Sequence, residues 1–253
     1  MKPVLELNGV CKNFGGVVAA KDVDIKVYPG AIRGLIGPNG AGKTTILNLI
    51  SGIYPVDAGR ITFLDKDITK MAPYNRARMG LGRTFQAPRF LQRSSIKDNL
   101  LLATDLNDQM GFFNSFMNKK GADFKKDLST LMEVAGFEFD EFDSISALPY
   151  GQRKLLEIVR TMLTNPKAML VDEPAAGLND AEIERAVALL KLATSRGTGV
   201  VLIEHRMDMV MNNCDEITVL NFGRVICDNV PSVVSKDAQV IEAYLGKQRE
   251  EVC

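Results

Sequence analysis

The run GPNGAGKTT, residues 37–45, constrains this chain more than any other feature. Within it Gly37, Gly42, Lys43 and Thr44 match the pattern G-x-x-x-x-G-K-[ST], with a predicted strand before the run and a predicted helix after it. Glycines let backbone N–H groups close around phosphates, and a helix N-terminus adds its positive dipole end. The run therefore predicts a nucleotide-binding loop in which Lys43, as an exposed cation, holds β- and γ-phosphate and Thr44 ligates Mg²⁺.

Short apolar runs and glycine-rich turns predict how the rest of the chain is organised. Residues 4–36 are typical of strands in a small mixed sheet, and the helix after the loop is expected to stop at Gly52. Strand patterns return at 168–173 and 199–205 with a helical pattern between them, which predicts βα units of a parallel sheet. Residues 216–229 predict a terminal hairpin before a polar tail.

Between about residues 90 and 163 strand patterns disappear and amphipathic helical patterns dominate. We therefore expect a single α/β domain over residues 1–253. About residues 1–89 and 164–253 would form its core, and about 90–163 an inserted helical subdomain.

Composition narrows the class of protein. With 253 residues, 46% hydrophobic and 25% charged, the chain can bury a sizeable core and is not a disordered sequence. Its 31 basic and 31 acidic residues give zero net charge, which implies no nucleic-acid partner. The four cysteines lack C-x-x-C spacing, which argues against zinc and for a reducing compartment. No secretion signal and no run of about eighteen apolar residues occurs, so we expect a cytosolic protein without a membrane span.

Polar residues follow two of the predicted strands. Asp172 and Glu173 stand at the strand end where parallel sheets bind ligands, so Asp172 is placed to reach Mg²⁺ and Glu173 to act as general base toward water. A solvated acidic strand end before Pro174 is the alternative, which the phosphate loop makes the weaker interpretation. His205, the only histidine, ends another strand and is expected near the same γ-phosphate. Taken alone, Gln86 is an ordinary loop glutamine.

The order of these motifs resembles that of the ATP-binding subunits of ATP-binding-cassette (ABC) transporters, over nearly the whole chain. The resemblance implies a P-loop fold with a RecA-like parallel-sheet core, an antiparallel β-subdomain and an inserted helical subdomain. It implies ATP and Mg²⁺ as ligands, with Thr44, Gln86 and Asp172 on the metal and Glu173, His205 and Gln86 in catalysis. The core residues expected to bind ATP are Phe14, stacked on adenine, and Gly37, Pro38, Asn39, Gly40, Ala41, Gly42, Lys43, Thr44 and Thr45.

The signature motif of the family, usually L-S-G-G-Q, reads Leu148-Pro149-Tyr150-Gly151-Gln152 here and opens a helix. In the family this helix N-terminus faces the γ-phosphate bound to the other ATPase subunit, which assigns Pro149, Gly151 and Gln152 to nucleotide binding. Proline in place of serine removes a phosphate hydrogen bond worth about 1.5–3 kcal/mol. The composite site is therefore expected to be weaker, although the helix dipole and the Gly151 N–H remain.

Several departures from the general family pattern resemble one subfamily. The D-loop, residues 176–179, reads AGLN in place of SALD, which changes a contact between subunits. Together with RTFQ, L-x-YGQ, IEH-x-M and the closing AYLG, it resembles the ATPases of branched-chain amino-acid importers. Phenylalanines within residues 112–116 either resemble an extra helical segment of that group or belong to the core.

The resemblance implies that ATP is hydrolysed between two subunits to drive a membrane permease. The partners would be a second ABC ATPase subunit, transmembrane permease subunits and, indirectly, a substrate-binding protein. Pro149 and Asn179 favour a paralogue over an identical second copy. The chain would lie in the cytoplasm, peripheral on the inner face of the cell membrane. The Gln86 junction and the helical insert would form a groove for a cytoplasmic helix of the permease.

Other functions fit less well. Cassette proteins of ribosomes or chromosomes generally carry two cassettes or a long coiled coil, which 253 residues do not hold. A GTPase-like switch needs N-K-x-D, and residues 118–121 (NKKG) lack the aspartate. A cassette for lipid export or for urea stays open, because the sequence names neither cargo nor transport direction.

Overall fold

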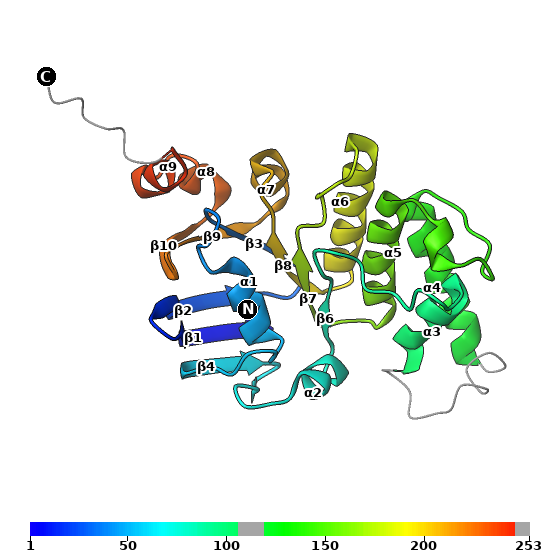
Figure 1. Ribbon diagram of the computed structural model, residues 1–253, viewed down its shortest axis with the longest axis horizontal. Coiled ribbons are helices and arrows are strands. Elements are labelled where there is room, and N and C mark those ends of the chain that lie inside the picture. The colour runs from blue at the N-terminus through cyan, green and yellow to red at the C-terminus, as the bar shows by residue number, and fades with distance from the viewer. Residues whose placement is uncertain (106–118, 246–253) are drawn as a thin grey trace, which may run out of the picture.

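The strands in the part of the chain that the structure describes form two separate sheets (Figure 1). The computed structural model describes residues 1–105 and 119–245. The smaller sheet is antiparallel, in the order β2-β1-β4-β5. Its strands are β1 (Leu5–Phe14), β2 (Val17–Val27), β4 (Ala58–Phe63) and β5 (Lys66–Asp67). Buried and accessible residues largely alternate along β1 and β2, as expected for a sheet with one face on the core.

The larger sheet has the strand order β10-β9-β3-β8-β7-β6 and is parallel except for the antiparallel β9–β10 hairpin. Its strands are β3 (Ile32–Ile36), β6 (Leu81–Arg83), β7 (Ala168–Asp172), β8 (Gly199–Ile203), β9 (Glu216–Asn221) and β10 (Arg224–Asn229). Every residue of β3, β7 and β8 is buried, which is typical of parallel strands covered on both faces. The parallel βα units and the terminal hairpin are confirmed.

The prediction of one small mixed sheet over residues 4–36 is wrong. β1 and β2 belong to the antiparallel sheet, whereas β3 lies inside the parallel one. The physical reason is burial: β3 is covered on both faces and pairs with β8 and β9, far away in the sequence.

Helices and the smaller sheet cover the two faces of the parallel sheet. Leu35, Leu170 and Val201 pack in the same apolar cluster as α1 and the antiparallel sheet. Their neighbours Val171 and Leu202 face the opposite side, toward α5 and α6. The helices are α1 (Lys43–Ile50), α2 (Pro73–Arg78), α3 (Ile96–Asp105), α4 (Lys119–Ala135), α5 (Tyr150–Leu163), α6 (Asp180–Ser195), α7 (Met207–Asn213), α8 (Pro231–Val234) and α9 (Ala238–Leu245), with a 3-10 turn, η1, at Ile145–Ala147.

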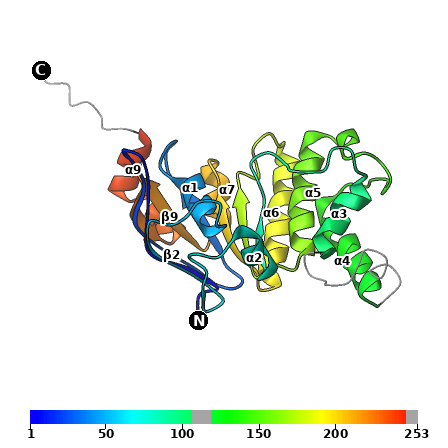
Figure 2. The ribbon, with the colours of Figure 1, turned by 60° about the horizontal axis from the view of Figure 1, so that its bottom comes forward.

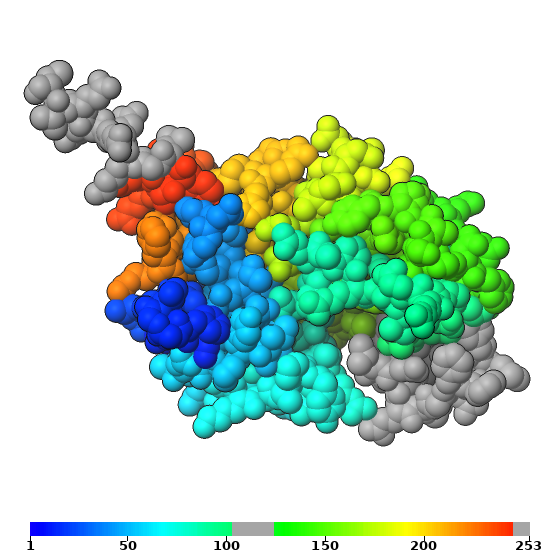
Figure 3. Space-filling view, viewed as in Figure 1, coloured from blue at the N-terminus to red at the C-terminus, as the bar shows by residue number. Residues whose placement is uncertain are grey.

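The helical region, made of α3, α4, η1 and α5, lies at one end of the molecule (Figures 2 and 3). Within it α5 contacts α3 and α4, and α5 also contacts α6 and β6 of the core. A bridge between Ser95 and Ser144 joins the segments before α3 and η1. The phenylalanine cluster at residues 112–116 lies outside the described residues.

The segment after β10 differs from the expected polar tail. It forms α8, which begins at Pro231, and α9, and Val234 and Val240 are buried. Proline is well suited to the first position of a helix, since its missing N–H has no intrahelical partner there. In the part of the chain that the structure describes, no helix combines the length and the apolar character that crossing a membrane requires.

Candidate functional site

Four loops that carry predicted site residues leave the same edge of the parallel sheet. The phosphate loop follows β3, Gln86 follows β6, Glu173 follows β7 and His205 follows β8. Because β3, β8, β7 and β6 are consecutive neighbours in this sheet, their carboxyl ends bring the four loops together.

Two glycines of the loop before α1 are required by its geometry. Gly37 has a φ of 150° and Gly42 a φ of 106°, both in the region that favours glycine. A Cβ on Gly37 would lie 2.1 Å from the Leu220 carbonyl oxygen, and one on Gly42 would lie 2.4 Å from that of Ala19. The first N–H groups of α1 have no acceptor within the helix, so this loop presents donors suited to an anion.

Lys43, the first residue of α1, is buried, with only 7% of its surface accessible. Its Nζ donates hydrogen bonds to the carbonyl oxygens of Gly37 (2.7 Å) and Pro38 (3.1 Å). The expectation of an exposed cation is therefore wrong, because the side chain folds back onto the loop. Burial lowers the pKa of Lys43, and the neighbouring carboxylates of Glu173 and Asp172 oppose that change.

The carboxylate of Glu173 contacts two other predicted site residues. One oxygen, Oε1, lies 3.0 Å from Nε2 of His205, and the other, Oε2, accepts a 2.9 Å hydrogen bond from Nε2 of Gln86. The backbone of Glu173 has a φ of +48°, an uncommon conformation for a residue with a side chain. The structure thus joins three residues from three separate loops around one carboxylate.

Asp172, the last residue of β7, is buried beside the guanidinium of Arg83. The distance between Arg83 Nη2 and Asp172 Oδ2 is 4.0 Å, and Arg83 also donates to the Ser51 hydroxyl at the end of α1. Burial raises the pKa of Asp172, and the charge of Arg83 opposes that change. Arg83 is the first residue of the RTFQ run at residues 83–86, but that pattern alone does not predict its contact with Asp172.

Phe14, at the end of β1, is 42% exposed. Its ring meets Tyr54 edge-on, with ring centroids 5.1 Å apart, and the Lys12 ammonium lies 5.3 Å from the Phe14 centroid. A partly exposed aromatic ring held by its neighbours suits stacking on a planar base. The sequence offers no motif for Tyr54, which comes shortly after α1.

The signature segment lies at the N-terminus of α5, where Pro149 is the residue before the first turn. It lies against the start of α6 and the turn before it. A Cβ on Gly151 would lie 2.0 Å from Oε1 of Glu182 in the first turn of α6, and the Tyr150 ring lies against Gly177 in the preceding turn. α5 packs in the apolar cluster on one face of the parallel sheet and α1 in the cluster on the other face, and Figure 1 shows β7 between the two helices. The described chain therefore does not bring Pro149, Gly151 and Gln152 to its own phosphate loop.

Asn179, the residue that departs from the usual D-loop, has a local structural role. Its side chain accepts a 2.9 Å hydrogen bond from the Glu182 N–H, and the Glu182 carboxylate accepts a 3.0 Å bond from the Asn179 N–H. This capping box satisfies N–H groups at the start of α6. Asparagine caps a helix about as well as aspartate, so the substitution preserves this turn.

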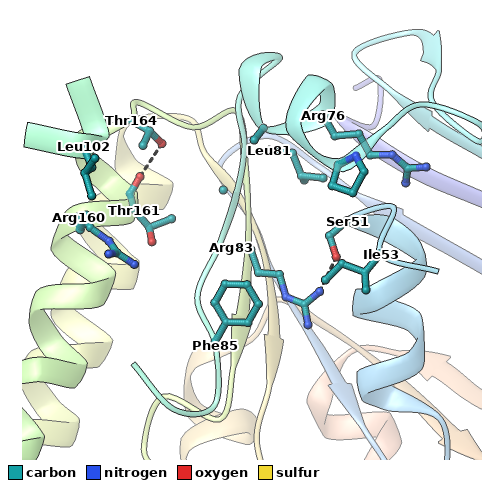
Figure 4. A pocket seen from close by; sticks show the side chains of 13 residues that line it. Ser51, Ile53, Arg76, Leu81, Arg83, Phe85, Leu102, Arg160, Thr161 and Thr164 are labelled. Atoms are coloured by element: carbon teal, nitrogen blue, oxygen red, sulfur yellow. Dashed lines mark hydrogen bonds between the residues drawn. The ribbon is translucent and has the colours of Figure 1, made fainter. Parts of the chain in front are cut away.

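A cavity of about 390 Å³ lies between the core and the helical region and is lined by Phe85, the residue before Gln86 (Figure 4). Arg83 and Phe85 lie at its centre, Ser51 on the α1 side, and Arg160 and Thr161 on the α5 side. The guanidinium of Arg83 lies 4.9 Å from the Phe85 ring centroid. The cavity therefore combines apolar surface with positive charge.

Glu157 on α5 is a buried carboxylate, 1% exposed, that supports the loop after Gln86. Its Oε1 accepts a 3.3 Å hydrogen bond from the Arg89 N–H, and Arg160 Nη2 lies 3.9 Å from the same oxygen. Burial raises the pKa of Glu157 to about 7, in spite of these two favourable contacts. No motif marks this residue, because its role depends on a loop distant in the sequence.

Glu157→Gln should remove a pH dependence of stability. The folded-state pKa of about 7 exceeds the ordinary value of 4.5, so between these pH values the folded chain holds a proton that the unfolded chain has lost. The free energy of unfolding of the wild type should therefore fall as the pH rises through this window, by up to about 3 kcal/mol. Chemical unfolding measures this free energy at about pH 5 and at about pH 8. The difference in unfolding free energy between Glu157→Gln and the wild type should shift in favour of the variant from the lower pH to the higher one. Glu184→Gln, on the exposed face of α6, is the control, and an equal pH response of wild type and Glu157→Gln contradicts the prediction.

The glycine loop and the carboxylates at the strand ends define the class of protein as a P-loop nucleotide-binding protein. A family model described as ABC transporter matches residues 20–176. The high-affinity branched-chain amino acid transport ATP-binding protein LivG of Escherichia coli (strain K12) is 35% identical, over 97% of this chain and 99% of LivG. The protein of the same description named BraF, from Pseudomonas aeruginosa, is 36% identical over 97% of this chain and 99% of BraF.

A solved structure agrees with these matches. MJ1267, described as an ATP-binding cassette of an ABC transporter in its ADP conformation, has a TM-score of 0.82 and 31% identity to this chain, covering 98% of this chain and all of MJ1267. The chain therefore belongs to the ABC transporter family, as an ATP-binding cassette. The expected family, the ABC ATPase fold class, the ATPase class of enzyme and ATP as ligand are confirmed.

Proposed function

We propose that this chain hydrolyses ATP to energise a membrane importer of branched-chain or related amino acids. The contact of Glu173 with both Gln86 and His205, close to Lys43, carries the hydrolytic part of the proposal. The cargo part is supported by LivG and BraF, which are named for branched-chain amino acid transport.

ATP would place its phosphates in the loop formed by residues 37–45 and its adenine on Phe14. The positive φ of Gly37 and Gly42 and the close carbonyls beside them favour a loop that only glycine can form around phosphates. Lys43 would exchange its carbonyl contacts for the β- and γ-phosphates.

Three oxygen-bearing side chains fit Mg²⁺, which prefers hard oxygen ligands. They are the hydroxyl of Thr44, the amide oxygen of Gln86 and the carboxylate of Asp172, whose burial makes a compensating cation favourable. When bound, the ion would neutralise charge on the β- and γ-phosphates.

Glu173 would act as general base. Its carboxylate takes a proton from the attacking water, while the bond between the γ-phosphorus and the oxygen that bridges to the β-phosphate breaks. His205 and Gln86 hold one carboxylate oxygen each, so both would orient the base. Lys43 would stabilise the charge that develops on the leaving phosphate.

A second ATPase subunit would complete the site. Because α5 and α1 pack on opposite faces of the parallel sheet, Pro149, Gly151 and Gln152 would reach a γ-phosphate only on another subunit. The missing serine hydroxyl at Pro149 supports pairing with a paralogue, whose own signature would supply that bond.

The cavity around Arg83 and Phe85 would receive a cytoplasmic helix of the permease. It lies where about residues 1–89 and 164–253, the proposed core, meet the proposed helical subdomain at about 90–163. Its mixture of apolar surface and arginines suits a short amphipathic segment. On this proposal the chain is a peripheral protein of the inner face of the cell membrane, and a substrate-binding protein presents the cargo.

Reconstitution tests the proposal. The chain, permease subunits and a second ATPase subunit are placed in vesicles with a substrate-binding protein, and ATP hydrolysis and uptake of labelled leucine are measured. Leucine-dependent uptake with stimulated hydrolysis is the expected result. Stimulation by urea or a lipid instead would replace the cargo assignment, and full turnover by the isolated monomer would overturn the transport-coupled mechanism.

A further inference from the structure

A buried cation on α5 contacts the residue that carries the proposed general base. Lys154 is 3% exposed, and its Nζ donates a 2.6 Å hydrogen bond to the backbone carbonyl oxygen of Glu173. Burial lowers the pKa of Lys154, and the negative charges of Glu157, Glu204, Glu173 and Asp172 oppose this change. Lysine is almost never fully buried unless it is paired, so this contact calls for a role.

The backbone of Glu173 has an unfavourable conformation that contacts with neighbouring residues must stabilise. A φ of +48° for a residue with a side chain costs about 1 kcal/mol or more, and it persists only where neighbours hold it. The Glu173 N–H donates to the Ile203 carbonyl at 2.9 Å, and its carbonyl accepts from the Ala176 N–H at 3.3 Å and from Lys154. Of these three contacts, only the Lys154 contact comes from a side chain.

Glu204, the residue before His205, extends this support to the neighbouring loop. It is 3% exposed; its Oε1 accepts a 2.6 Å hydrogen bond from the Ala175 N–H, and its Oε2 a 3.0 Å bond from the His205 N–H. One carboxylate thus ties the loop after Glu173 to the loop that carries His205. The opposite charges of Lys154 and Glu204 offset each other's burial.

We propose that Lys154 is a positioning residue for ATP hydrolysis. It holds the Glu173 peptide in its left-handed conformation, and this keeps the carboxylate between Gln86 and His205. The inference rests on the proposed function of Glu173 as the general base. Because α5 begins at the signature segment, Lys154 also links that segment directly to the base, so that a displacement of α5 is transmitted to the Glu173 carbonyl.

The test is Lys154→Met in the assembled transporter, compared with Lys154→Arg and with Lys191→Met on the exposed face of α6. Loss of a buried hydrogen bond from a charged donor should lower kcat at saturating ATP by about 10- to 100-fold. The Kd for ATP should change less than about twofold, because Lys154 acts through Glu173. Lys154→Arg should recover most of the activity, and Lys191→Met should behave as the wild type.

The combination with Glu173→Gln separates positioning from a general structural role. Once Glu173→Gln has removed the base, adding Lys154→Met should lower the residual hydrolysis no further. Unchanged kcat in Lys154→Met, or a further loss in the double variant, overturns the inference. Should Lys154→Met not fold, Lys154→Gln is measured in the same way against the same criteria. A wild-type transporter without ATP hydrolysis would instead refute the proposed function, and the inference with it.

Discussion

Glu173→Gln should bind ATP as the wild type does and lose about 100- to 10,000-fold in kcat, the range expected for removal of a general base. Glutamine has nearly the same size and can still contact Gln86 and His205, but its amide cannot take the proton of the attacking water. ATP should therefore stay uncleaved between two closed subunits. Phosphate release at saturating ATP measures the loss of hydrolysis, and size-exclusion chromatography with ATP measures the persistent dimer.

A matched exchange controls for the change of charge. Glu184→Gln, on the exposed face of α6, should hydrolyse ATP at the wild-type rate. Steady hydrolysis by Glu173→Gln at a comparable rate would remove Glu173 from the role of base.

Lys43→Ala should weaken ATP binding by a factor of roughly 100 or more. The ammonium supplies charge-assisted hydrogen bonds to the β- and γ-phosphates, whose combined loss costs about 3 kcal/mol or more. Since Lys43 is buried against the carbonyls of Gly37 and Pro38, the variant should also lose some thermal stability while keeping its fold. Isothermal titration with ATP and a thermal unfolding curve measure the two effects separately.

Lys66→Ala, a change at an exposed lysine of β5, is the control for Lys43→Ala. It should leave both ATP affinity and the unfolding midpoint unchanged. Near-normal affinity of Lys43→Ala for ATP would refute the assignment of Lys43 to the phosphates.

The sequence predicts the edge of the sheet at which the site lies because that inference needs only local patterns. One strand pattern ends in Asp172 and another ends just before His205. In a parallel sheet the carboxyl ends of both strands lie at the same edge, so these two patterns are enough to place the site there. The pairing of β3 with β8 and β9 was not predictable in this way, since periodicity reports burial and not which strand is the neighbour.

The features of the site that the sequence does not predict depend on side-chain burial and on contacts between residues distant in the sequence. Lys43 matches a motif, but its burial follows from how the loop closes over it. Lys154 and Glu204 look like ordinary charged residues, and only the folded chain places them against the backbone around Glu173. Helices α8 and α9 are four and eight residues long, so Val234 and Val240 belong to segments too short to show a helical period that predicts them.

Phe14 stands on the antiparallel sheet, whereas the loop at residues 37–45 springs from the parallel sheet. A nucleotide that contacts both would bridge the two sheets, and its binding free energy would add to the stability that their shared apolar core provides. In each cycle, release of the nucleotide would then weaken the interface between the two sheets and binding would strengthen it. This change would not depend on any movement of a second subunit.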